Sequence, residues 1–162
     1  GSPTPYHVRS HNGSGSGSLW RSNSFIMNVL RIILGLLLGL FVGAMVNGSF
    51  IELGMKIFPY PNGVNLNTPE GMKAFYELPV KYYIFPFLAH AIGTLSGCLV
   101  ALLLVRTHAK WVVYSIGLLF FIGGVMAVYM INAPWWFDML DLSLAYFPMA
   151  WLSTKSKFAK TA

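Results

Sequence analysis

The chain has 162 residues, of which 56% are hydrophobic and 10% are charged, and its mean hydropathy is +0.60. An average soluble protein carries about 25% charged residues, so this composition excludes a soluble domain with a small core. The formal net charge of +6 would favour a nucleic-acid partner if the basic residues formed one face. They flank apolar segments instead, which is typical of membrane orientation signals and of attraction to anionic headgroups. We expect an integral membrane protein with membrane lipids as partners and no nucleic-acid partner.

The first 26 residues are expected to be an added tag, a linker and a junction. Residues 1–18 are polar and close in a GSGSGS alternation, which is typical of a designed flexible linker. A natural disordered tail is the alternative. On the first interpretation the native chain starts at Met27, and the histidines and arginines before it carry no function.

Two apolar segments, 27–47 and 82–105, are expected to span the membrane, because roughly 20 apolar residues cross the hydrocarbon as a helix. Each segment carries a small residue at every fourth position, which allows close approach of two helix backbones. We expect the two stripes to pack against each other, with a homodimer face as the alternative. The helix-packing residues are Gly35, Gly39 and Gly43 in the first segment and Ala89, Gly93, Gly97 and Ala101 in the second.

Residues 50–81 are expected to form an extracytoplasmic loop that contains one short helix. Thr68 can cap this helix, Pro69 suits its first position and Glu70 suits its dipole, whereas Pro79 stops it. Apolar residues gather on one side of the segment, so we expect the helix to lie at the membrane interface.

Segments 111–131 and 134–152 are the third and fourth expected spans, and a basic tail follows at 153–162. The predicted fold is therefore an all-α membrane domain over residues 27–152, a compact bundle of four transmembrane helices. Lys and Arg are more numerous on one side of the membrane, which predicts that both termini are cytoplasmic. We expect the location to be a bacterial inner membrane.

Five polar residues are expected at a similar depth in the outer leaflet, when depth is counted along each helix at about 1.5 Å per residue. An ionisable residue inside a membrane is costly to bury, so its default interpretation is functional. Asp141 is the expected partner of His90, although a purely structural hydrogen bond is an equal alternative for the histidine. Asp138 also suits a helix N-terminus. The candidates for ligand binding or proton handling are His90, Asp141, Asp138, Asn47 and Glu52.

We expect no metal and no cofactor. A metal site built from His90, Asp141 and Glu52 has suitable ligand types, but no two of these residues share a recognisable local spacing. No motif for a nucleophilic serine, a phosphate-binding loop, a zinc protease or a dinucleotide site is present in the sequence.

The leading functional hypothesis is a pocket around His90, Asp141 and Asn47 that binds a small solute, ion or lipid, with transport of the bound molecule as an extension of it. One alternative is a membrane scaffold or subunit that acts through glycine-stripe packing, and a homo-oligomer is left open. A second alternative is an intramembrane enzyme in which His90 is a general base oriented by Asp141. The sequence alone leaves open whether the protein is an enzyme.

Overall fold

The structure of the chain is a computed structural model that describes Gly1 and residues 14–156, without the side chains of 14–20 and 22. The regular structure of these residues is entirely helical, with no strand. Most of the expected tag and the end of the basic tail lie outside the described residues. The helices are α1 (Ser14–Ile57), α2 (Pro69–Tyr76), α3 (Lys81–Leu104), α4 (Ala109–Met130), α5 (Trp135–Leu144) and α6 (Phe147–Ser153).

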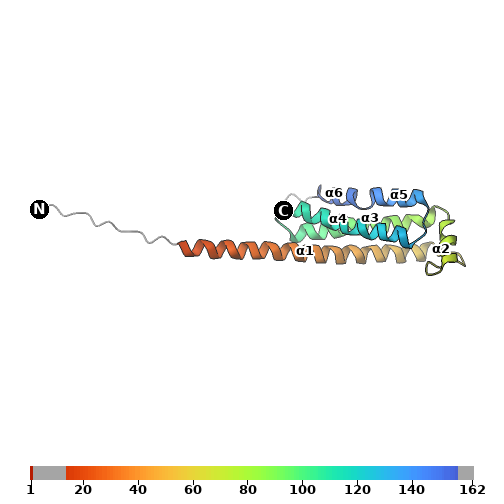
Figure 1. Cartoon of the computed structure of the whole chain (residues 1–162), viewed down its shortest axis with the longest axis horizontal. Helices are drawn as coiled ribbons and strands as arrows, with labels where there is room; N and C mark the ends of the chain where they lie inside the picture. The colour runs from red at the N-terminus through yellow and green to blue at the C-terminus, as the bar shows by residue number, and fades with distance from the viewer. Residues whose placement is uncertain (2–13, 157–162) are drawn as a thin grey trace.

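Three helices in the described part of the chain are long and apolar enough to cross a membrane: α1 from Asn23 to Ile57, α3 and α4. These apolar helices are compatible with a membrane location. Figure 1 shows α1, α3 and α4 running along one bundle, with α5 and α6 following each other along its side. Helix α2 lies across one end of the bundle, here named the α2 end, and the turn between α3 and α4 lies at the opposite end, named the turn end.

Helices α1 and α3 are antiparallel and meet through their small residues. A Cβ atom added to Gly39 would lie 2.7 Å from the carbonyl oxygen of Gly97, and one added to Gly43 would lie 2.8 Å from that of Gly93. Real Cβ atoms do not come this close to backbone oxygen, so both positions require glycine at this helix separation. The predicted stripes therefore face each other within one chain.

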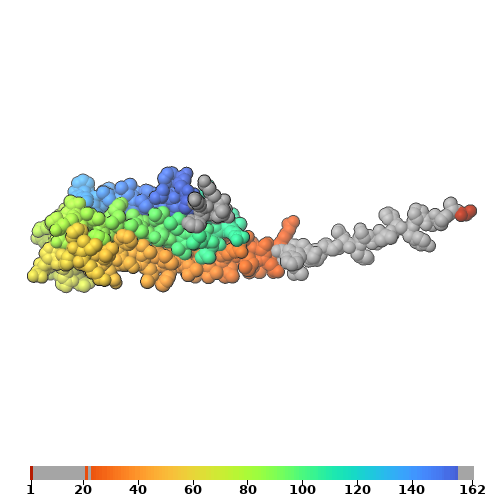
Figure 2. All heavy atoms as spheres, turned by 180° about the vertical axis from the view of Figure 1, so that it is seen from behind, coloured from red at the N-terminus to blue at the C-terminus, as the bar shows by residue number. Residues whose placement is uncertain are grey.

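Helix α1 is longer than the 27–47 segment expected from its apolar run. Its 44 residues extend about 66 Å, roughly twice the hydrocarbon thickness. The helix continues after Asn47 because packing on α3 continues: Gly54 lies directly against the Phe85 side chain. Residues 50–57, expected in a loop, are therefore helical. At its other end α1 extends past the turn end of the bundle, as Figures 1 and 2 show.

The short helix expected between the first two apolar segments is α2, and its ends follow the local chemistry. Thr68 is its N-cap residue, and its hydroxyl oxygen accepts a hydrogen bond of 3.1 Å from the N–H of Gly71. Pro69 opens the helix. The hydroxyl of Tyr83 on α3 donates a 2.6 Å hydrogen bond to the carbonyl of Phe75, which attaches α2 to the bundle.

The segment expected as a fourth continuous helix, 134–152, is divided into α5 and α6. The division lies at Ala145 and Tyr146. Pro148 explains it, because proline has no N–H to donate to the carbonyl of Leu144 and its ring would clash with that carbonyl in a continuous helix. The proline instead occupies the first turn of α6, where a missing N–H costs nothing.

Three buried apolar clusters hold the bundle. One lies at the turn end and joins α3, α4 and α6 through Cys98, Ile116 and Ala150, among others. A second lies at the α2 end around Phe75, Tyr83 and Phe137, and a third lies where α5 meets α6, around Ala91, Ala145 and Tyr146. The last two clusters flank the candidate site.

Candidate functional site

A cavity of about 270 Å³, here named the α2-end cavity, lies between α1, α3, α4 and α5. Residues of the segment before α2 and of α2 itself complete its wall. Most of its lining is aliphatic or aromatic. The polar residues among its lining are Asn47, Tyr60, His90, Asp138 and Asp141.

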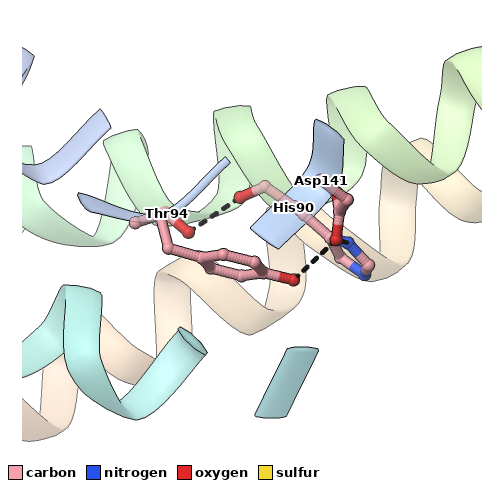
Figure 3. A network of polar contacts seen from close by, with 4 residues as sticks. His90, Thr94 and Asp141 are labelled. Carbon is pink, nitrogen blue, oxygen red and sulfur yellow. Dashed lines mark hydrogen bonds and ion pairs between the residues drawn. The ribbon is translucent and has the colours of Figure 1, made fainter. Parts of the chain in front are cut away.

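His90 and Asp141 are hydrogen-bonded to each other across two helices. The Nδ1 atom of His90 on α3 lies 2.7 Å from Oδ2 of Asp141 on α5. Figure 3 shows the two side chains pointing toward each other. Because a carboxylate oxygen only accepts hydrogen bonds, His90 donates through Nδ1–H. This arrangement fixes the ring orientation and leaves Nε2 without a hydrogen bond to the described residues.

Tyr146, which lies at the division between α5 and α6, also contacts Asp141. Its hydroxyl donates a 3.0 Å hydrogen bond to the same carboxylate oxygen, Oδ2 of Asp141. The Tyr146 ring also lies beside the His90 ring, with centroids 5.8 Å apart. The side chain is buried, so its hydroxyl needs this partner. Oδ2 of Asp141 therefore accepts two hydrogen bonds.

The second carboxylate oxygen of Asp141 accepts no hydrogen bond. Oδ1 is buried and has no partner among the described residues. An unpaired buried acceptor ordinarily costs about 1–3 kcal/mol, and more when it is charged. Asp141 also lines the α2-end cavity, so a bound molecule that reached Oδ1 would supply the missing partner.

Thr94, Gly124 and Pro86 lie beside the residues of this contact. The Thr94 hydroxyl, one turn after His90, donates a 2.8 Å hydrogen bond to the His90 carbonyl, as Figure 3 shows. Gly124 on α4 lies directly against the hydroxyl end of Tyr146. Pro86, one turn before His90, leaves the Tyr82 carbonyl without its usual helical donor.

The structure brings four of the five candidate residues to one place. Asn47, His90, Asp138 and Asp141 all line the α2-end cavity, and Asn47 also lies against Gly93. Glu52 is exposed on α1 and does not line it. The alternative metal triad with Glu52 is therefore not assembled, and the part of the chain that the structure describes contains no group of three potential metal ligands.

The electrostatic character of the cavity is acidic. Two carboxyl groups line it, whereas no Lys or Arg side chain does. Tyr60, in the segment before α2, adds a hydroxyl, and burial raises the pKa of this phenol above its ordinary value. Tyr60 therefore remains a neutral hydrogen-bonding group at physiological pH.

Tyr146 is the member of the site that the sequence analysis did not identify. It lies in a segment expected to be continuous helix, where residues 141 and 146 do not share a face. The available signal was Pro148, because proline favours the first turn of a helix and therefore predicts a helix boundary close to the tyrosine.

Comparisons with known protein families, curated proteins and solved structures find no match for this chain.

Proposed function

We propose that this chain is a polytopic membrane protein that binds a small, mainly apolar molecule in the α2-end cavity. The observation that carries the proposal is the position of Asp141, which lines the cavity and whose Oδ1 is a buried acceptor without a partner among the described residues. Ligand sites in proteins are mostly apolar cavities with a few convergent polar groups, which matches this lining. Transport of the bound molecule is an extension of the same proposal.

The ligand class follows from what the cavity lacks. Its apolar walls favour an apolar body, and its unpaired carboxylate oxygen favours a hydrogen-bond donor such as an amine or a hydroxyl. With two carboxyl groups and no Lys or Arg in the lining, a cationic amine is favoured over an anion. A fatty amine combines these features.

The proposal includes a fourth membrane crossing formed by α5 and α6 together. Two half-helices can cross a membrane where the irregular backbone between them is covered by protein, and transporters place binding sites at such divisions. Here the division at Ala145 and Tyr146 is buried, and Asp141 lies one turn before it. With four crossings both termini lie on one side, which the distribution of basic residues assigns to the cytoplasm. Helix α2 then lies at the outer interface.

The test uses ligands with one apolar chain and different head groups. Octylamine should raise the unfolding temperature of the purified protein in detergent, octanol should raise it less, and octanoate should not raise it. Asp141→Asn should abolish the response to octylamine, because the neutral amide presents a weaker acceptor and no charge. Glu52→Gln removes the same charge from an exposed position and should leave the response intact. An unchanged response in Asp141→Asn would contradict the proposal.

The scaffold alternative is weakened because the glycine stripes already pack against each other within one chain. Gly39 and Gly43 already contact α3 of the same chain, so this face is occupied before any partner arrives. The enzyme alternative keeps one favourable observation: Asp141 holds Nδ1 of His90, which leaves Nε2 for proton transfer. Turnover of a lipid-like substrate that disappears in His90→Ala would favour it over binding alone.

A further inference from the structure

A second hollow, of about 300 Å³, lies at the turn end of the bundle. It is formed where the last turn of α3, the α3–α4 turn, the first turn of α4 and the residue after α6 meet. Arg106, His108 and Lys110 contribute basic side chains, and Leu102, Trp111 and Thr154 contribute the rest. It is separate from the α2-end cavity, because α3 and α4 reach it at their opposite ends.

The turn end has an uncompensated positive charge. The chain contains five acidic residues, and all of them lie toward the α2 end, in the C-terminal part of α1, in or beside α2, and in α5. No Asp or Glu side chain is therefore available to pair with Arg106 or Lys110. Lys155, directly after Thr154, adds a further basic group at this end and lies 4.9 Å above the Trp151 ring.

The N-terminus of α4 adds backbone donors to the same place. His108 is the N-cap residue, and no side chain in the described part of the chain caps the helix. The first turn of α4 carries no acidic residue. Uncapped N–H groups at the start of a helix favour an anion. The φ angle of 59° at His108 turns the chain sharply into α4, and residues of the basic turn and of the first turn of α4 line the same hollow.

The level of the hollow favours a lipid over a soluble anion. It lies beside Leu104, the last residue of α3, and Ala109, the first residue of α4. Both helices are candidate spans, so this end of each lies at the depth of lipid head groups. Leu102 offers an apolar wall toward the span, and the exposed Trp111 is of the type that lies at the membrane interface. A phosphate group with attached acyl chains matches both parts of the lining.

We propose that this turn-end hollow binds the head group of an anionic phospholipid, with Arg106 and Lys110 contacting the phosphate. The basic residues would orient the chain in the membrane without any hollow. The hollow, together with the uncapped helix N-terminus, adds a specific place for one lipid. This site does not depend on the proposed function of the α2-end cavity.

The test compares two double variants that remove the same charge from opposite ends. Arg106→Gln with Lys110→Gln changes the hollow, and Lys56→Gln with Lys73→Gln changes exposed residues near the α2 end. Binding of phosphatidylglycerol and of phosphatidylcholine to the full-length protein is measured by native mass spectrometry from detergent. Loss of a basic residue that contacts the bound head group should lower the affinity for anionic lipid roughly fivefold. The first variant should therefore lose roughly 25-fold, and the control should retain wild-type affinity.

Three results would overturn the proposal. The first is equal binding of the two phospholipids. The second is an equal loss in both double variants, which would indicate a diffuse charge effect. The third is competition by millimolar inorganic phosphate as strong as that by phosphatidylglycerol, which would indicate a soluble anion.

A measurement on the unsubstituted protein keeps the test decisive even if the first variant does not fold. Photo-crosslinking with a diazirine-bearing phosphatidylglycerol should place adducts on residues 102–111 and beside Thr154. Adducts confined to other segments would contradict the assignment.

Discussion

The hydroxyl group of Tyr146 occupies the space that a methyl group on Gly124 would need. The same hydroxyl donates to Oδ2 of Asp141. Because glycine has no side chain, Gly124 on α4 permits the hydrogen bond that fixes Asp141 on α5. Three helices, α3, α4 and α5, thus depend on each other at the candidate site.

Replacing Gly124 by Ala should displace Tyr146 and destabilise the protein by about 1–3 kcal/mol, as overpacking of a close contact does. Gly123 provides the matched control, since a Cβ atom there meets no atom within 4 Å. Gly123→Ala should be neutral or slightly stabilising, because alanine is the better helix former. Denaturant unfolding of both variants in detergent measures the difference, and equal midpoints would contradict the proposed contact.

Replacing Tyr146 by Phe keeps the buried ring and removes the hydroxyl. The expected loss is about 1.5–3 kcal/mol, the range for a hydrogen bond to a charged group. Tyr129→Phe is the control, since this tyrosine is 88% exposed. If thermal unfolding midpoints of the two variants coincide, the hydroxyl of Tyr146 makes no net contribution to stability.

Replacing Gly39 by Ala should separate α1 from α3, because the new methyl group meets the carbonyl oxygen of Gly97. A backbone oxygen cannot move aside as a flexible side chain can, so we expect a loss of about 1–3 kcal/mol. Gly48 lies on the same helix with open space around it, and Gly48→Ala should leave stability unchanged. The measurement is the midpoint of unfolding in a denaturing detergent, and a stable Gly39→Ala variant would refute the close contact.

Replacing Thr68 by Ala should loosen α2 without unfolding the bundle. The N–H of Gly71 loses its acceptor, and loss of such a cap costs about 1 kcal/mol. Amide hydrogen exchange should therefore accelerate roughly fivefold in residues 69–76 and remain unchanged in α3. Thr68→Ser retains the hydroxyl and should restore the slow exchange. Acceleration spread over the whole chain would indicate that α2 supports global stability instead.

The features that could be predicted from the sequence are those encoded locally or by depth. The cap at Thr68 depends on adjacent residues only. The contact between His90 and Asp141 follows from depth along two helices, because both residues lie a similar distance from the same end of the bundle. The pairing of the two glycine stripes follows from residue size, since only small side chains allow such close backbones.

The features that could not be predicted depend on packing between distant segments. Hydropathy continues unbroken through Ala145 and Tyr146, so the apolar run concealed the division that Pro148 imposes. Glu52 has the right depth, but its direction around α1 depends on which face of the helix packs on α3. The role of Tyr146 required both the division and the absence of a side chain at Gly124.

The division between α5 and α6 also separates residues that belong to different apolar clusters. Helix α6 belongs to the turn-end cluster through Ala150, whereas α5 belongs to the α2-end cluster through Phe137. Pro148 has no N–H with which to bond the preceding turn, so the third cluster and the hydrogen bond from Tyr146 to Asp141 are what join α5 to α6 across the division. A change in the angle between the two helices would therefore move Asp141 relative to His90 and change the volume of the cavity. The carboxylate of the candidate site thus lies beside a break in the helix, where side chains rather than backbone hydrogen bonds fix its position.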